Sequence, residues 1–194
     1  MRTWLHLIGS LVAVVSFGAC SSSAPLFVER LDTNTGVTVL NATEPLVLYR
    51  DNSGHAAHAR DYVYMGPIEV NNMGAESYYL WLGIWSTMRD ATRLVSQRNG
   101  FESVVLYADG EPMPLVIAGW TLDTIGVSEP VYPRPVAGAA DAYYRVTADQ
   151  IRLITDARDV ELRTGTAREV AYTLWDQQSL PSTSLQAFVR RARN

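Results

Sequence analysis

The stretch Tyr78-Tyr-Leu-Trp-Leu-Gly-Ile-Trp-Ser-Thr-Met88 decides the fold class of this chain. Aromatic and branched apolar side chains dominate it, as is typical of a β-strand. Because side chains alternate along a strand, one face would carry large aromatic rings and the other face aliphatic side chains. The aromatic face holds Tyr79, Trp81 and Trp85. A strand of this strength predicts a β-rich domain around it.

Short runs of the same kind lie on both sides of this strand, separated by turn residues. In chain order they are 27–31, 37–40, 46–49, 62–65, 68–70, 103–107, 115–117, 143–146, 160–163 and 170–175. Gly66-Pro67 predicts a bulge or kink, and Asp109-Gly110 is a hairpin signal. The pattern predicts a mainly β domain, either an antiparallel β-sandwich or a barrel-like roll.

Helical signals occur in two places. Thr147-Ala-Asp-Gln150 matches a capping box and predicts a short helix over 148–157. Apolar residues from Leu185 to Ala192 form one stripe at helical spacing, with Ser182 or Ser184 available as the N-cap. We therefore expect one or two short helices, including a C-terminal helix.

Two further segments are less regular. Residues 89–97 could form a helical turn. Residues 121–141 are rich in proline and glycine, which predicts a long loop with at most one edge strand.

The N-terminus combines Arg2, an apolar run over residues 4–17, two small residues and then Cys20, the only cysteine. The apolar run is shorter than the roughly 20 residues that a membrane span needs. This arrangement resembles a bacterial lipoprotein signal. The resemblance implies cleavage before Cys20, acylation of Cys20 (a palmitate-type modification) and attachment to a membrane of the cell envelope. Ser21 at the next position favours the outer membrane over the inner one.

The same resemblance divides the chain into a signal peptide (1–19), a lipidated tether (20–25) and a single β-rich domain (26–194). The last part has the size of one ordinary domain with its own core. Acylation of Cys20 leaves this domain without a thiol, so packing alone must stabilise it. The formal charge of −4 for the whole chain argues against a nucleic-acid partner.

The aromatic face of 78–88 is the first candidate binding site. Gly83 would leave a gap in it where a sugar ring or a partner's apolar side chain could lie. The alternative is that the strand is covered on both faces, as continuously apolar strands usually are. In the proline-rich segment 130–135, Tyr132 is a further candidate for partner contact, although a plain crossover between sheets explains that segment equally well.

Histidines supply a weaker candidate site. His55 and His58, flanked by Asp51 and Asp61, have spacing compatible with a zinc-type site. An ordinary surface loop explains the same residues, because polar loops normally lie in solvent.

Arginines cluster at the C-terminus. Arg190, Arg191 and Arg193 would complement the dipole of the predicted C-terminal helix. Alternatively, they would contact anionic lipid headgroups or lipopolysaccharide phosphates near the anchor.

The sequence contains no nucleophile elbow, phosphate loop or Cys–His pair. We therefore expect a non-catalytic binding or accessory lipoprotein that needs no cofactor and engages an envelope protein or glycan. One alternative is an envelope hydrolase, metal-assisted through His55 and His58. The other is a purely structural surface protein.

Overall fold

The computed structural model describes residues 24–52, 58–88, 98, 100–165 and 169–193. The strands are β1 (Phe27–Asp32), β2 (Val37–Ala42), β3 (Leu46–Asp51), β4 (Arg60–Asn72), β5 (Ala75–Ser86), β6 (Val104–Ala108), β7 (Glu111–Gly119), β8 (Ala140–Val146), β9 (Val160–Thr164) and β10 (Val170–Leu174). The helical segments are the 3-10 helix η1 (Leu122–Ile125) and the α-helices α2 (Ala148–Asp156) and α3 (Thr183–Arg191).

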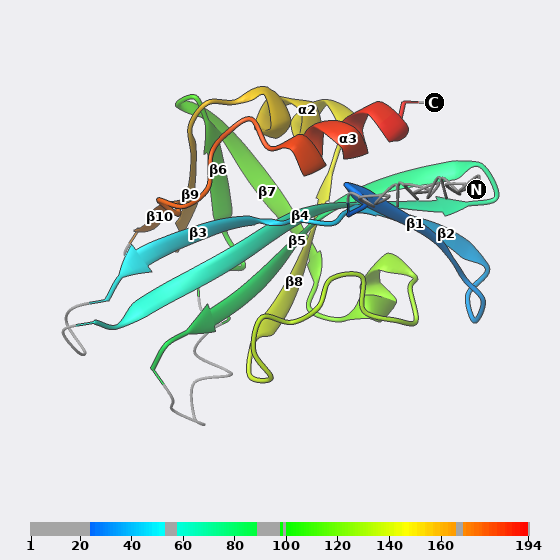
Figure 1. The fold of residues 1–194 in the computed structure, drawn as a ribbon. Helices are drawn as coiled ribbons and strands as arrows, with labels where there is room; N and C mark the ends of the chain where they lie inside the picture. Colours follow the sequence, from blue (N-terminus) through cyan, green and yellow to red (C-terminus); the bar gives the residue numbers. More distant parts are fainter. Residues whose placement is uncertain (1–23, 53–57, 89–97, 99, 166–168, 194) are drawn as a thin grey trace, which may run out of the picture.

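The described strands form one antiparallel sheet that closes on itself. Around the ring the order is β4-β3-β10-β9-β6-β7-β8-β5, and β5 then pairs with β4. These eight strands make a barrel, which Figure 1 shows with α2 and α3 lying across one end. The predicted mainly β fold is therefore confirmed, and of its two forms the barrel is the one observed rather than the sandwich.

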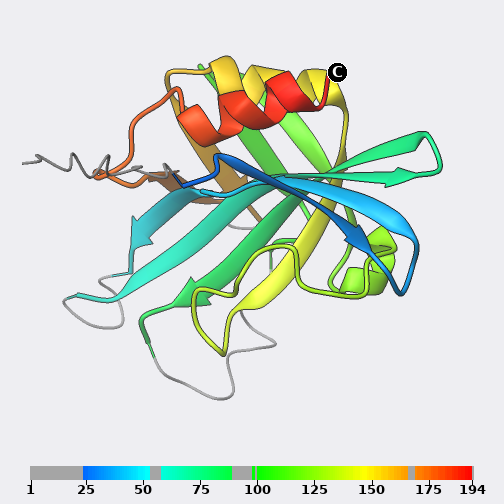
Figure 2. The same ribbon diagram turned by 45° about the vertical axis from the view of Figure 1, so that its right-hand side comes forward.

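The remaining strands, β1 and β2, add a projection to the barrel. The first half of β4 pairs with β3, whereas its second half, from Ile68 to Asn71, pairs with β2. β1 then pairs with β2 along its whole length. We call β1, β2 and the ends of β4 and β5 around the Met73–Gly74 turn the extension; Figure 2 shows it projecting beyond the barrel.

Gly66 and Pro67 do not form the predicted bulge or kink. The register between β4 and β5 runs without a break through this point, with Gly66 opposite Trp81 and Pro67 opposite Leu80. Instead, β4 changes its other partner here, from β3 to β2. Because Pro67 lies where neither of those strands pairs with β4, its missing N–H group leaves no ladder bond unmade.

Both helices bury apolar side chains in the barrel core. α2 contributes Ile151 and Ile154, and α3 contributes Leu185 and Phe188. The capping box of α2 is confirmed, because the Thr147 hydroxyl accepts a hydrogen bond from the Gln150 N–H and the Gln150 side chain accepts one from the Thr147 N–H.

The N-cap of α3 is Ser182 and not Ser184. The Ser182 hydroxyl accepts a hydrogen bond from the Leu185 N–H, at 3.5 Å. Ser184 is buried, and its hydroxyl donates to the Leu26 carbonyl at 2.6 Å. The predicted C-terminal helix is therefore confirmed, and its first turn is also tied to the chain just before β1.

A second, smaller core lies on the outer face of β2, β4, β5 and β8. The loop over residues 121–139 covers this face; it contains η1 and none of the edge strand that the sequence allowed. The ring of Tyr132 stacks on Trp81 with centroids 4.7 Å apart. The Tyr132 hydroxyl donates to the Pro67 carbonyl at 2.9 Å, and Nε1 of Trp81 donates to Asp141 at 3.0 Å. The loop is thus packed and hydrogen-bonded onto the barrel.

The β6–β7 hairpin forms where Asp109-Gly110 predicts it. Both turn residues have positive φ, 50° and 84°, as a tight hairpin turn requires. β7 begins at Glu111, well before the predicted start at Leu115. Pro112 and Pro114 lie inside the strand, although proline usually argues against a strand. β8 pairs with β7 only from Val116 onward, so the first half of β7 has an open edge, and the prolines fit where their nitrogen atoms face that edge.

The possible helical turn over 89–97 lies outside the described residues. The β9–β10 hairpin is confirmed by its pairing, although the turn residues 166–168 also lie outside them. Among the residues that the structure does describe, no helix is long and apolar enough to span a membrane.

Replacing Gly66 should loosen the loop over 121–139. An added Cβ would lie 2.3 Å from the Tyr132 ring, so we expect Gly66→Ala to lower the free energy of unfolding by about 1–3 kcal/mol in a urea titration followed by circular dichroism. Gly138→Ala is the matched control, because its added Cβ meets nothing within 4 Å and should change stability by less than about 0.5 kcal/mol. Equal effects of the two changes would contradict the packing role of Gly66.

Candidate functional site

Four aromatic side chains meet on the outer face of the barrel at the end away from the extension. Tyr49 of β3 is the register partner of Tyr62 of β4, and Tyr62 is in turn the register partner of Trp85 of β5. Tyr64 lies on the same face of β4, two residues further along. We call Tyr49, Tyr62, Tyr64 and Trp85 the aromatic row.

The rings of the row contact one another in sequence. Tyr62 and Trp85 are stacked, with centroids 4.7 Å apart and an interplanar angle of 14°. Tyr49 lies 6.4 Å from Tyr62, and Tyr64 lies 6.4 Å from Trp85, both in tilted arrangements. All four side chains are partly exposed. The row is therefore a continuous aromatic surface that solvent reaches.

Charged groups border one end of the row. The Arg60 guanidinium lies 4.9 Å from the centroid of the Tyr49 ring, and its Nε donates to Asp51 at 2.9 Å. Interactions with the Tyr62 hydroxyl and the Asp51 carboxylate raise the pKa of Arg60 above its usual value, so it stays charged. The hydroxyl of Tyr49 lies 3.4 Å from Asp176, whose negative charge raises the pKa of that tyrosine.

One polar atom of the row lacks a partner. Nε1 of Trp85 is buried and has no hydrogen-bond partner among the described residues. Buried donors are normally satisfied, so this N–H group is an exception within the row.

The predicted aromatic face of 78–88 is divided in the structure. Trp85 belongs to the aromatic row, but Tyr79 and Trp81 are covered by the loop over 121–139 and are only 7% and 1% exposed. Tyr132, which was predicted to be available to a partner, is 4% exposed and is the side chain that covers Trp81. At Tyr79 and Trp81 the strand is thus covered on both faces, which was the alternative interpretation.

The gap predicted at Gly83 is filled from within the protein. An added Cβ on this residue would lie 2.6 Å from the indole ring of Trp81, which lies across it. The space that Gly83 provides therefore holds the neighbouring tryptophan and leaves no room for a flat ligand.

Only one of the two histidines of the predicted metal site lies among the described residues. His58 is exposed, whereas His55 lies outside the described residues. Asp61 accepts hydrogen bonds from Arg50, and Asp51 pairs with Arg60. Within the described ranges, no group of three or more histidine, cysteine, aspartate or glutamate residues could hold a metal ion. A site that includes His55 stays a prediction.

The arginine cluster is not uniform. Arg191 forms a two-pronged ion pair with Glu29 of β1, with nitrogen–oxygen distances of 2.7–3.0 Å. Arg190 and Arg193 are exposed. Arg191 is thus engaged in joining α3 to the extension, and contact of the other two with an anionic surface stays a prediction.

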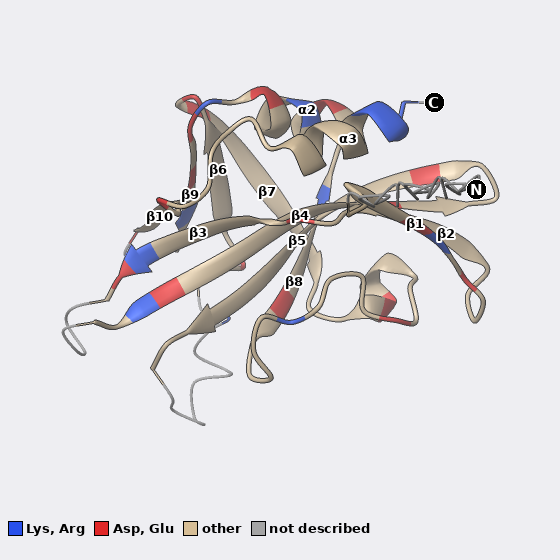
Figure 3. Cartoon of the chain, in the orientation of Figure 1, with Lys and Arg blue, Asp and Glu red and all other residues tan. Residues whose placement is uncertain are grey.

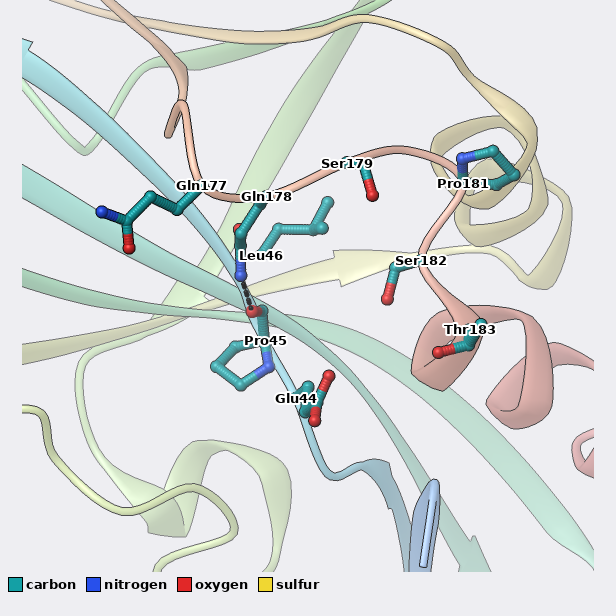
Figure 4. A pocket seen from close by; sticks show the side chains of 9 residues that line it. All are labelled: Glu44, Pro45, Leu46, Gln177, Gln178, Ser179, Pro181, Ser182 and Thr183. Carbon is teal, nitrogen blue, oxygen red and sulfur yellow. Dashed lines mark hydrogen bonds between the residues drawn. The ribbon is translucent and has the colours of Figure 1, made fainter. Parts of the chain in front are cut away.

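Cys20 lies outside the described residues, but the structure shows where the chain enters the domain. The Thr43 hydroxyl donates to the Pro25 carbonyl at 2.8 Å, and Ser184 holds the next carbonyl, that of Leu26. Beside this point, a polar pocket of about 230 Å³ lies between the start of β3 and the segment leading to α3. Figure 4 shows Gln178 within it, hydrogen-bonded to Pro45.

Comparisons of the chain with protein-family models, curated proteins and solved structures find no match. Sequence reasoning identified Trp85 but missed Tyr49, Tyr62 and Tyr64. The alternation Tyr62-x-Tyr64 was visible, but the pairing that gathers the four rings was not.

The two tryptophans of β5 should differ sharply in their effect on stability. We expect Trp81→Ala to cost about 3–5 kcal/mol of unfolding free energy, because the ring is fully buried and hydrogen-bonded. Trp85→Ala should cost about 1–2 kcal/mol, since mainly ring stacking is lost. Thermal and urea unfolding of both variants would test this, and similar losses would show that Trp85 is also a structural core residue.

Proposed function

We propose that this protein is a lipid-anchored lipoprotein of the bacterial cell envelope whose barrel binds an envelope glycan through the aromatic row. The observation that carries the proposal is the cross-strand stack of Tyr49, Tyr62 and Trp85, partly exposed and bordered by Arg60. The N-terminal resemblance supplies the location, and the row supplies the contact.

The chemistry of the row suits a sugar. Aromatic rings offer flat apolar area, and the C–H faces of a pyranose ring pack against such area. Hydroxyl groups at the edge of the sugar need polar partners, which Arg60, Asp51 and the tyrosine hydroxyls supply. A few polar groups around a mainly apolar contact is the usual composition of a small-molecule site.

A glycan fits this surface better than a partner protein's apolar side chain. The row lies on the outer face of three paired strands, and the four aromatic residues are only partly exposed. A protein partner would need a larger apolar contact area than four partly exposed rings provide. Engagement of an envelope protein is therefore one outcome that the experiment below can reveal.

The position of the row agrees with a membrane-proximal ligand. The chain enters the domain at Pro25, which Thr43 holds, and β3 begins directly afterwards at Leu46. Tyr49 lies roughly 10 Å further along that strand. With an extended tether of roughly 20 Å for residues 20–25, the row lies within roughly 40 Å of the anchor.

The row should be required for glycan binding. Trp85→Ala and Tyr62→Ala should each weaken binding of soluble peptidoglycan fragments or lipopolysaccharide oligosaccharide on the order of tenfold, because each removes one stacking ring. Calorimetric titration of the full chain, purified from membranes in detergent, measures this. Tyr107→Ala is the matched control, since Tyr107 is also partly exposed and also carries an arginine, Arg163, over its ring.

Four results would decide between the alternatives. Loss of binding in the row variants alone supports the proposal. Equal loss in Tyr107→Ala, or no binding of any glycan by the wild-type chain, would overturn it. If the wild-type chain captures one specific envelope protein and the row variants do not, the row binds a protein partner instead.

The anchor has a test of its own. Cys20→Ser should abolish incorporation of radiolabelled palmitate and release the chain from the membrane fraction, because the only thiol that can be acylated is removed. A matched Ser21→Ala change, one residue further on, should leave both properties unchanged. Membrane attachment that persists in Cys20→Ser would contradict lipid anchoring.

A further inference from the structure

A small acidic pocket lies between the end of α3 and the extension, at the opposite end of β4 and β5 from the aromatic row. Its volume is about 280 Å³, and its lining includes Glu29, Glu69, Glu76 and Arg191. Figure 3 shows the basic end of α3 above the acidic part of the extension. The pocket therefore brings three carboxylates and one guanidinium together.

Glu69 occupies an unusual position for a carboxylate. It lies in β4, between Leu40 of β2 and Tyr78 of β5, and is only 9% exposed. Its Oε2 atom has no hydrogen-bond partner among the described residues. Burial, followed by the nearby charge of Glu76, raises the pKa of Glu69 to about 6. At neutral pH it is thus a mostly ionised carboxylate whose Oε2 atom lacks a hydrogen-bond partner among the described residues.

The cation in the pocket, Arg191, is already paired with one of the pocket's own carboxylates. Arg191 makes its two-pronged ion pair with Glu29, so these two charges cancel. Glu76 accepts a hydrogen bond from the Tyr78 hydroxyl, which supplies no charge. The charge of Arg152 of α2 also acts on that tyrosine, but Arg152 does not line the pocket. Glu69 and Glu76 therefore leave the pocket with a net negative charge.

We propose that this pocket binds a small organic cation through a primary ammonium group, with Glu69 as its principal counter-ion and Glu76 at the rim. An ammonium group carries three donors and one positive charge, so it would satisfy the free Oε2 of Glu69 and offset the cost of burying that charge. The resulting hydrogen bond is of the strong, charge-assisted kind.

A metal ion suits the pocket less well than an organic cation. None of the described carboxylates are grouped closely enough to form a three-residue metal set. A volume of about 280 Å³ is instead near the lower end of the range for small-molecule sites. The lining polar side chains Thr38 and Asn71 provide further hydrogen-bonding groups for an organic ligand.

The test uses 1,4-diaminobutane as the probe and 1,4-butanediol as its uncharged counterpart. Calorimetric titration of the full chain in detergent at pH 7.5 should show binding of the diamine and none of the diol. Glu69→Gln should weaken diamine binding at least tenfold, and Glu76→Gln should weaken it severalfold. Glu111→Gln, which changes an exposed carboxylate on β7, should have no effect.

The pH dependence follows from Glu69. With a pKa of about 6, roughly a tenth of the molecules carry ionised Glu69 at pH 5, so the apparent affinity should fall about tenfold between pH 7.5 and pH 5. Because Glu69→Gln removes a buried charge, its melting temperature at pH 7.5 should equal or exceed that of the wild type. Weaker binding in this variant would then not reflect unfolding.

Each remaining outcome overturns the proposal. These are no diamine binding by the wild type, equal binding of diamine and diol, or diamine binding that Glu69→Gln and Glu76→Gln leave unchanged. Tighter binding of Ca²⁺ than of the diamine, lost in Glu69→Gln, would assign the pocket to a metal instead. None of these results bears on the aromatic row, whose variants are tested separately.

Discussion

The pairing of β4 with β5 is the constraint on which the rest of the structure depends. Residues 61–72 pair with residues 75–86 without a shift in register. The two strands of this hairpin are longer than any other strand of the described sheet. Because β4 also pairs with β3 and β5 also pairs with β8, the hairpin closes the barrel. Its far end extends past the ring, where β1, β2 and α3 complete the acidic pocket.

The same hairpin carries two aromatic groups that differ in what surrounds them. In its middle, Gly66 and Gly83 leave room for the rings of Tyr132 and Trp81 to lie flat, and a loop can cover both rings. Toward one end of the two strands, Tyr62 and Trp85 stack on each other at the surface. The positions of the two glycines thus distinguish a buried aromatic stack, which holds a loop, from a partly exposed stack at the surface.

The sequence predicted most local features well, the bulge expected at Gly66-Pro67 excepted, and long-range coverage poorly. Strand alternation, the Thr147–Gln150 capping box and the Asp109-Gly110 turn depend on neighbours in the chain, and all three are confirmed. The burial of Trp81 depends on Tyr132, which comes from a loop distant in sequence. The sequence did not indicate that Glu69 is buried in a pocket, because one acidic residue in an apolar strand does not reveal which residues pack against it. Pairing partners and covering loops were the missing information.

The two prolines in β7 have a consequence for how these molecules behave when crowded. Along the open edge of β7, Pro112 and Pro114 stand where N–H groups would otherwise point outward, so that stretch offers carbonyl acceptors but no donors. A strand from a second molecule could not continue the sheet there, because every other bond of the ladder would be absent. At high local concentration, such as the proposed lipid anchor would produce on one membrane surface, this edge cannot serve as the template for polymerisation.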